Sequence, residues 1–209
     1  MQTRRTMICS AIKTALCFAA LLAVVSVPSA TANAEEIRHS FLGVGKANRV
    51  VIVGEDNKIE WRYDAPASDG WVLPSGNVLL ALYPTKGFPG GGVVEVDRKT
   101  KKTVFEYQGK QREISTAQPL ADGRLLVAEL GPTPKALILN KKGEVVQETP
   151  LACQKKNAHM QTRMLRMLPN GNLIAPHLLD FAVNEYEPKT GKVLNTFPTD
   201  DRGRAKRDW

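Results

Sequence analysis

The sequence predicts an all-β protein built from repeated antiparallel sheets, and three observations support this. A strand-like apolar phrase with a central glycine turn occurs three times, at residues 73–80, 120–127 and 168–175. The runs between these copies are short, often β-branched and separated by polar turns, and no segment keeps the period of an amphipathic helix. The turn glycines lie 47 and then 48 residues apart. A fixed period in this range is typical of propeller blades, so we predict a β-propeller of about four four-stranded blades.

Each repeat unit is expected to contain four short strands. In the second unit, residues 70–74 form the innermost strand and residues 77–83 form the next one. Residues 93–97 are rich in β-branched side chains, as a packed strand requires, and residues 102–107 follow a polar turn as the outermost strand.

A hairpin of the third and outermost strands recurs in every unit. Its outermost strands are expected to start at residues 58, 102, 144 and 192. The first unit has further strand-like runs at residues 40–44 and 50–53, whereas its innermost strand has no clear counterpart. The repeat domain, residues 35–209, therefore divides into units at approximately 38–64, 65–108, 109–151 and 152–198, with a tail at 199–209.

The hairpin turns resemble the repeats of the quinoprotein (PQQ-like) propeller superfamily. Repeats of this kind join the third strand to the last by a turn of the type acid-x-x-Thr-Gly-Lys, and a Trp often follows. Residues 187–192 match this turn, and residues 97–102 match it except that Lys101 stands at the Gly position. Trp61 occupies the Trp place, Phe105 substitutes for it, and the third and fourth units depart from it. The resemblance covers residues 38–198 and implies propeller blades.

Neither quinone binding nor dehydrogenase chemistry is carried over from this resemblance. Quinone-binding dehydrogenases of the superfamily commonly stack their cofactor against adjacent disulfide-bonded cysteines, and their chains carry more blades. Here Cys153 is the single cysteine after residue 34. A lone cysteine excludes an intramolecular disulfide in the mature chain, and burial is its default state. We therefore predict no cofactor and do not support PQQ.

The small number of units leaves three explanations open. Propellers close into rings of about 4 to 8 blades, which protects the edges of their sheets. The chain is then either part of a larger propeller, a component that closes a ring with another copy, or a compact four-bladed or open structure by itself. A prematurely ended array would expose an unpaired sheet face and would be prone to aggregate.

Residues 1–34 have the features of a cleaved export signal. A basic start without acids precedes an apolar run at residues 15–27, and an A-x-A pattern places the cleavage between Ala34 and Glu35. The apolar run is shorter than the roughly 20 residues that a membrane span needs, so we expect no transmembrane span in the mature chain. The protein is expected in the periplasm or secreted. The arginine pair at residues 4–5 leaves both the general secretory and the twin-arginine routes open.

The positive charge of the chain does not indicate nucleic-acid binding. The formal net charge is +8, but the lysines are dispersed in pairs that fall in predicted turns, such as those at residues 141–142 and 155–156. No basic helix and no stripe of stacking aromatic residues accompanies them, and export argues against such a partner. The expected partners are a small molecule or a protein, with self-association as a way to close the ring.

The candidate site residues lie in connections that a propeller brings to one face. In this fold, ligands usually meet the loops between consecutive sheets and between the second and third strands of a sheet. His159, His177 and Asp180 fall in two such loops, and this residue set can bind a divalent metal or carry out acid–base chemistry. No H-x-H or H-E-x-x-H spacing is present, so the alternative is that both histidines hydrogen-bond loop backbone. The full candidate set is Asp69, Arg112, Glu129, His159, His177 and Asp180.

Two classes of function, and a third reading of the chain, are compatible with these observations. An exported propeller module that binds a ligand or protein without chemistry of its own agrees with the lack of a catalytic signature. A metal-assisted, hydrolase-like enzyme would use a site on the channel face. The chain is otherwise a truncated fragment whose function belongs to a longer protein. Because propellers host many unrelated functions, the fold by itself does not select among them.

Overall fold

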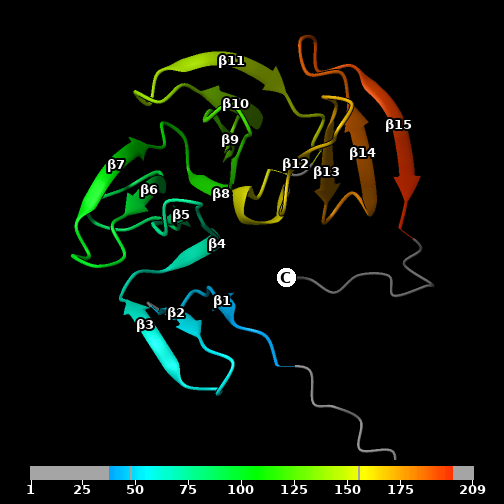
Figure 1. Cartoon of the computed structure of the whole chain (residues 1–209). Helices are drawn as coiled ribbons and strands as arrows, with labels where there is room; N and C mark the ends of the chain where they lie inside the picture. Colours follow the sequence, from blue (N-terminus) through cyan, green and yellow to red (C-terminus); the bar gives the residue numbers. More distant parts are fainter. Residues whose placement is uncertain (1–37, 48, 155, 200–209) are drawn as a thin grey trace, which may run out of the picture. The chain divides into compact units, whose positions relative to one another are not determined.

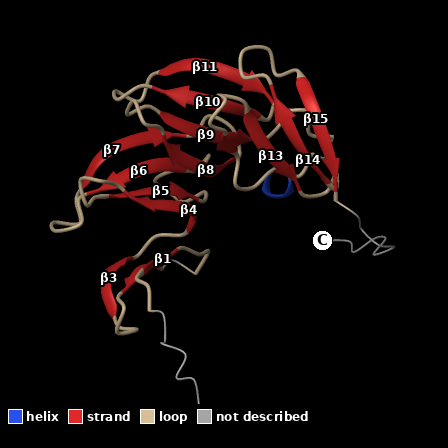
Figure 2. Cartoon of the chain, turned by 45° about the vertical axis from the view of Figure 1, so that its right-hand side comes forward, coloured by secondary structure: helices blue, strands red, loops and turns tan. Residues whose placement is uncertain are grey.

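The computed structural model describes residues 38–199 apart from residues 48 and 155 (Figure 1). This part of the chain contains 15 strands and one short 3-10 helix, η1 (Ala158–Met160). The strands form four sheets in chain order, and every strand pair is antiparallel. Figure 2 shows strands throughout the described part with the single helical turn in blue. The predicted all-β, blade-like architecture is confirmed.

The sheets differ in one respect, since the first has three strands and the others have four. The first sheet contains β1 (Phe41–Gly43), β2 (Val50–Val53) and β3 (Ile59–Tyr63). The second contains β4 (Ala67–Val72), β5 (Val78–Leu82), β6 (Gly92–Val96) and β7 (Thr103–Gln108). The third contains β8 (Glu113–Pro119), β9 (Leu125–Leu130), β10 (Lys135–Leu139) and β11 (Val145–Pro150). The fourth contains β12 (Arg166–Met167), β13 (Leu173–His177), β14 (Ala182–Tyr186) and β15 (Val193–Pro198).

The first sheet has no innermost strand among the described residues. Its strands β1, β2 and β3 correspond to the second, third and outermost strands of the other sheets. The predicted export signal at residues 1–34 and most of the tail at 199–209 lie outside the described residues. No helix in the described part is long and apolar enough to cross a membrane.

The thrice-repeated phrase forms the same turn in three sheets. In the second sheet, the Leu73 N–H donates to Asn77 O, and the Gly76 N–H donates back to Leu73 O. Gly76, Gly123 and Gly171 have φ angles of +87°, +80° and +87°. This left-handed conformation is open to glycine at no steric cost, which explains why glycine stands at this place in every copy.

The turn between the third and outermost strands is held by an acidic side chain. Asp97 accepts hydrogen bonds from both the backbone N–H and the hydroxyl of Thr100, at 2.6 and 2.8 Å. Glu187 binds Thr190 in the same way, at 2.7 and 2.6 Å. Lys101 is left-handed, with φ +58°, at the place where the fourth sheet has a glycine. The acid and threonine of the sequence pattern are therefore the residues that shape this turn.

A β-bulge recurs at one place in every outermost strand. The register shifts once between the third and outermost strands of each sheet, which leaves one residue of the outermost strand without a cross-strand partner. Its side chain is exposed in every sheet, because a bulge leaves its extra residue outside the regular pairing. We call these four residues the bulge positions: Glu60, Val104, Val146 and Leu194.

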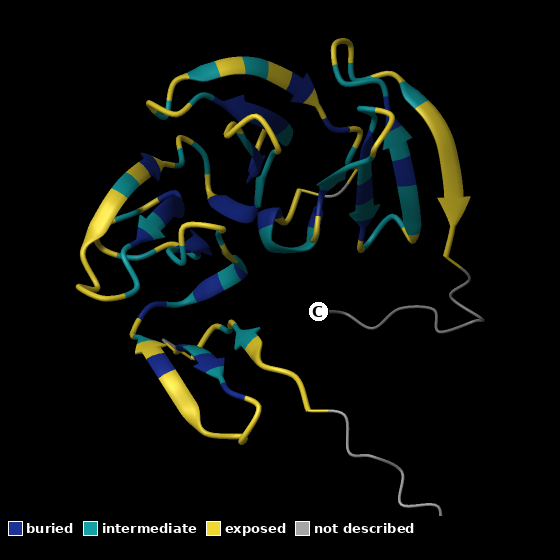
Figure 3. Ribbon diagram, in the orientation of Figure 1, coloured by how far each residue is buried: buried dark blue, intermediate teal, exposed yellow. Residues whose placement is uncertain are grey.

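The core consists of three apolar clusters, one between each pair of consecutive sheets. Strand β5 shows why, because all five of its residues are buried. Leu80 faces the first sheet and Leu79 faces the third, so the two faces of the strand contribute to different clusters. Figure 3 shows this burial concentrated in the inner strands. The packing of one sheet face on the next therefore holds the array together.

Candidate functional site

The connections that enter the innermost strands lie at the same edge of each sheet as the loops between the second and third strands. This follows from antiparallel order, since every second chain reversal returns to the same edge. We call this edge the connection face. It includes the loops that follow β5, β9 and β13 and the long connection between β11 and β12, which carries η1.

A buried ion pair joins the innermost strands of three sheets. Asp69 on β4 is 4% exposed, and its Oδ2 lies 2.9 Å from a guanidinium nitrogen of Arg166 on β12. The same carboxylate accepts the Ala117 N–H of β8 at 3.3 Å. The Arg166 guanidinium also lies 5.2 Å from the ring centre of Trp71. Burial raises the pKa of Asp69, although Arg166 and the backbone N–H groups favour its charged form.

A second polar cluster lies on the connection face, centred on Glu113. This carboxylate is largely buried and receives a hydrogen bond of 2.6 Å from Arg163. His159 Nδ1 lies 3.1 Å from the same carboxylate and 2.5 Å from Arg163. Because a guanidinium can only donate, His159 Nδ1 is the acceptor in its contact with Arg163.

An aromatic ring adjoins this cluster. The ring centre of Tyr83 lies 5.7 Å from that of His159 and 5.8 Å from the Arg163 guanidinium. The ammonium of Lys46 lies 6.0 Å from the same ring centre. Both distances are near the outer limit for cation–π attraction. The Tyr83 ring is therefore approached by positively charged groups from two separate segments of the chain.

A third cluster joins the connection after β11 to the fourth sheet and contains Cys153, His177 and Tyr186, of which the last two are buried. The Tyr186 hydroxyl accepts the Ala152 N–H at 3.2 Å and the Asn184 amide at 3.3 Å. These two donors occupy its two acceptor sites, so its own proton goes to His177 Nε2, 2.5 Å away. The proton of His177 is then on Nδ1.

This tautomer determines what the histidine can do. His177 Nδ1 lies 3.1 Å from the Gln161 carbonyl and 3.0 Å from Cys153 Sγ, so it donates to these atoms. Its one basic nitrogen is engaged by Tyr186 and does not face the thiol. Burial lowers the pKa of His177, and burial together with the charge of Asp180 raises the pKa of Cys153 to about 12. The thiol is therefore protonated near neutral pH and has no base beside it, which does not favour nucleophilic catalysis.

A cavity of about 490 Å³ opens on the connection face beside this thiol. Arg112 and Lys156 line it, together with Cys153, Gln154 and Gln161. Gln161 is held in place by two hydrogen bonds to the backbone of Gly131, at 2.9 and 3.0 Å. No aspartate or glutamate is among the residues that line this cavity. Among the described residues, the wall therefore has two cationic side chains and no carboxylate, and Asp180 lies behind it, bound to the Gln154 N–H at 3.0 Å.

The structure distributes the six predicted site residues over several environments. Asp69 lies in the buried ion pair, Arg112 in the cavity, and His159 beside Glu113. Asp180 accepts the Gln154 N–H at 3.0 Å and acts electrostatically on Cys153 and His177. Glu129 is fully buried, and Oε1 accepts the Lys110 N–H while Oε2 has no hydrogen-bonding partner among the described residues.

His159 and His177 have different hydrogen-bonding partners, and His177 is 1% exposed. Within residues 38–199 as described, no group of three or more His, Cys, Asp or Glu side chains is placed to hold one metal ion. The divalent metal at His159, His177 and Asp180 stays a prediction.

Sequence reasoning missed two arginines that organise this face, Arg163 and Arg166. Arg166 lies on a strand of only two residues after a long connection, where no alternating pattern marks a strand. The available signal was the place of Arg166 just before the repeated phrase at residues 168–175. Strand β4 stands in the same place before the copy of the phrase at residues 73–80.

Comparison with solved structures shows the fold to be that of a β-propeller. No protein-family model and no curated protein sequence matches the chain. A protein of unknown function from Bacteroides caccae is similar with a TM-score of 0.67 and 24% identity, over 78% of this chain and 58% of that chain. The WD40 β-propeller domain of Doa1 is similar with a TM-score of 0.56 and 12% identity, over 78% of this chain and 51% of that one.

An inactive H270A virginiamycin B lyase from Staphylococcus aureus, in a structure with quinupristin, is also similar. Its TM-score is 0.52 and its identity 12%, over 79% of this chain and 57% of that chain. The chain thus spans between half and three fifths of the length of these structures. Identities this low establish the shared architecture of the blades and carry no assignment of activity.

Proposed function

We propose that this chain is an exported β-propeller module that binds a small anionic ligand and carries out no chemistry of its own. The observation that carries the proposal is the cavity of about 490 Å³ on the connection face, with Arg112 and Lys156 in its wall and no carboxylate among its lining residues. Its volume falls within the range of roughly 300–1,000 Å³ that is usual for small-molecule sites.

The chemistry of the wall favours a carboxylate or phosphate group. In the described part of the chain, neither Arg112 nor Lys156 takes part in an ion pair. A guanidinium binds such anions through two parallel hydrogen bonds, and an ammonium adds a point charge. Gln154 and Gln161 supply neutral polar groups beside them, as a site that orients its ligand requires.

The absence of chemistry is proposed from the arrangement of Cys153 and His177. The pKa of the thiol in the cavity wall is raised to about 12, and the basic nitrogen of His177 is engaged by Tyr186. A reaction at this thiol would need both a thiolate and a base that faces it.

Ligand binding is tested by calorimetric titration of the purified protein with inorganic phosphate and with citrate. We expect saturable binding of at least one probe, weakened about tenfold or more in Arg112→Ala and in Lys156→Ala, because hydrogen bonds to charged groups contribute about 1.5–3 kcal/mol. Lys99→Ala is the matched control, since Lys99 is an exposed lysine in the turn after β6, at the opposite edge of its sheet. No saturable binding of either probe, or equal binding by all three variants, would overturn the proposal.

Export and the relation to known propellers belong to the same proposal. The signal-like residues 1–34 support a periplasmic or secreted location, and the acid–threonine turns support a relation to the PQQ-like propeller superfamily without its quinone. Expression of the full chain in a Gram-negative host tests the first point. We expect the protein in the periplasmic extract with Glu35 as its first residue by mass spectrometry. Uncleaved protein confined to the cytoplasm would contradict export.

A further inference from the structure

The fourth sheet has one face that packs on the third sheet and a second face that no sheet covers among the described residues. This uncovered face has the same features as the faces with which the first three sheets pack on the sheet that follows them. One position in the outermost strand shows this best, and it is occupied by Tyr63, Tyr107, Thr149 and Phe197, each paired with the corresponding residue of the third strand. Tyr63 packs into the first apolar cluster, and Tyr107 and Thr149 are 7% and 1% exposed. Phe197 is 52% exposed. The fourth sheet therefore exposes a large apolar side chain at the position where the side chains of the first three sheets are buried or partly buried.

The residue two places earlier binds the next sheet directly. Trp61 Nε1 donates to the Arg98 carbonyl at 2.9 Å, and Gln147 Nε2 donates to the Pro188 carbonyl at 2.7 Å. Both carbonyls directly follow the acid of the turn between the third and outermost strands. Asn195 occupies this place in the fourth sheet, and its amide donates instead to Glu185 in its own sheet, at 2.6 Å. The fourth sheet thus also has a polar side chain at this place, and its amide is bound within the sheet.

The remainder of the face corresponds residue by residue to the face of the second sheet that packs on the third. Asn77 binds Glu95 at 2.6 Å, and Asn172 binds Glu185 at 2.7 Å, which fixes the correspondence. The second sheet then contributes Leu79, Ala81 and Val93, which are 0% exposed. Their counterparts are only half-buried: Ile174, Pro176 and Val183.

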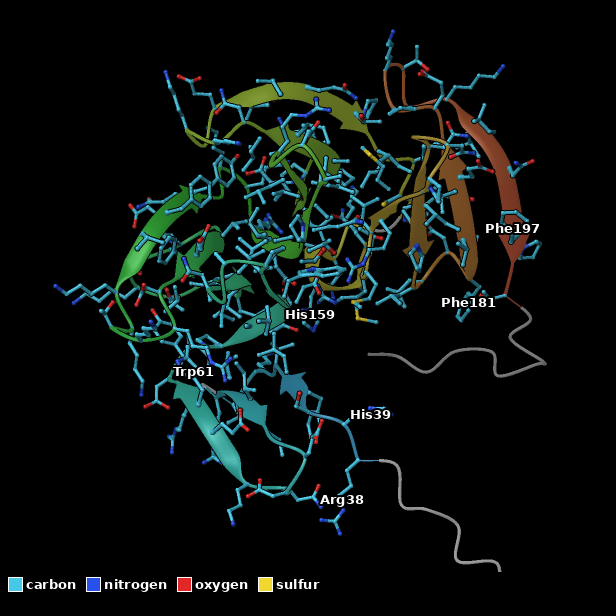
Figure 4. All side chains as sticks on the ribbon, viewed as in Figure 1. Arg38, His39, Trp61, His159, Phe181 and Phe197 are labelled. Atoms are coloured by element: carbon cyan, nitrogen blue, oxygen red, sulfur yellow. The ribbon has the colours of Figure 1, made fainter. Side chains whose placement is uncertain are left out.

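Exposure at this face is not a general property of outermost strands. Leu194 is 41% exposed, but it is a bulge position, and the bulge residues Val104 and Val146 of internal sheets are exposed as well. Phe197 has no exposed counterpart. Figure 4 shows Phe197 on β15 and Phe181 in the loop before β14, and Phe181 is 47% exposed beside the end of β15.

The first sheet presents the complementary half of such a junction. Ile59 is 58% exposed, whereas Val145 and Val193 at the same place pack into the second and third apolar clusters. The second sheet has the polar Thr103 there, and this residue is exposed, so the large apolar residue is what sets Ile59 apart. Phe41, from the same sheet, is 56% exposed. Within the described residues, the chain therefore carries both surfaces of one further sheet-to-sheet junction, at its two ends.

We propose that the Phe197 face of one chain packs on the Ile59 face of a second copy, as a repeat of the three junctions within the chain. A second copy is the occupant that the structure favours, because its first sheet carries an exposed face of the type that the fourth sheet is built to cover. Such a contact joins different surfaces of identical chains, and it generates a ring when the rotation closes. The proposal is independent of the anion-binding cavity.

Light scattering after gel filtration, over a range of protein concentrations, tests this inference. We expect the wild type to reach a multiple of the chain mass, and Phe197→Asp to raise the dissociation constant at least tenfold. Leu194→Asp is the matched control from the same strand, and it should associate as the wild type does. Thermal melts of both variants check that each is folded, which the exposure of both side chains favours.

Complementation distinguishes this head-to-tail contact from other kinds of association. Ile59→Asp removes the other half of the junction, so this variant and Phe197→Asp should each be monomeric alone. Mixed in equal amounts, they retain one intact pair of surfaces and should form a 1:1 dimer that cannot grow further. A monomeric wild type at all concentrations, equal disruption by Leu194→Asp, or no dimer in the mixture would overturn the proposal.

Discussion

Replacing Arg166 with methionine is expected to lower the free energy of unfolding by about 3–5 kcal/mol. Asp69 is 4% exposed, and in the variant its charge would no longer be paired. The backbone N–H of Ala117 would be its main remaining partner from another sheet, at 3.3 Å. Since the pair connects the innermost strands of the second and fourth sheets, its loss should also weaken the array across its centre.

Chemical denaturation of the wild type and the variant measures this change. Arg124→Met is the control, because Arg124 pairs with Asp122 at 2.7 Å in an exposed turn. Exposed pairs contribute about 0–1 kcal/mol, so the control should be nearly neutral. Adding Asp69→Leu to Arg166→Met should recover much of the loss, since it removes the unpaired charge. An Arg166→Met variant no less stable than Arg124→Met would contradict the argument.

The effect of pH has a defined sign. Burial raises the pKa of Asp69 above its ordinary value of 3.8, so the folded protein binds this proton more readily than the unfolded chain does. The stability that this group contributes is therefore present below pH 3.8 and is lost as the pH rises through the folded pKa. Removing Arg166 should raise that pKa further. The loss in Arg166→Met should consequently be smaller in acid than at neutral pH.

Tyr186→Phe is expected to lower the free energy of unfolding by about 2–4 kcal/mol, because a buried group that loses its hydrogen bond costs about 1–3 kcal/mol. Three such groups result, namely the Ala152 N–H, the Asn184 amide and His177 Nε2, which now lie 3.2, 3.3 and 2.5 Å from the hydroxyl. The side chain is otherwise unchanged in shape, so the apolar packing of the third cluster should be retained.

Tyr107→Phe provides a matched control for this measurement. Tyr107 is 7% exposed, and its hydroxyl has no hydrogen-bonding partner among the described residues. Burial and the nearby charges of Glu129 and Glu148 raise its pKa to about 12, so the group removed is a neutral and unpartnered hydroxyl. Its deletion should be neutral or stabilising in the same denaturation experiment. Equal destabilisation by both substitutions would show that the Tyr186 hydrogen bonds do not matter.

The elements that local chemistry specifies could be predicted closely. The strand at residues 93–97 corresponds to β6 (Gly92–Val96), and the run at residues 50–53 corresponds to β2 (Val50–Val53). Turn glycines and β-branched runs determine the local backbone within a few residues, so the turns and strands that they specify can be predicted without the rest of the fold. The innermost strand predicted at residues 70–74 lies instead at β4 (Ala67–Val72), because its limits depend on pairing with β5 and not on its own composition.

The candidate site was less accessible to sequence reasoning. His159 and His177 were chosen because their loops share a face, but the hydrogen-bonding state of each ring depends on residues far along the chain. Glu113 and Arg163, 50 residues apart, surround the first histidine. Tyr186 engages the second from β14. No local pattern encodes these partners, since they meet only when the sheets pack.

The sequence by itself determined the repeating unit of this protein: the glycine turns, the acid–threonine turns and the alternation of strands, all of which depend on contacts within a few residues. The tertiary structure alone decided which charges are buried and paired, which nitrogen of His177 carries the proton, where the cavity of about 490 Å³ opens, and which sheet faces remain uncovered. These properties arise from side chains contributed by different sheets. Burial and electrostatic environment are collective quantities, so they exist only once those sheets are packed together.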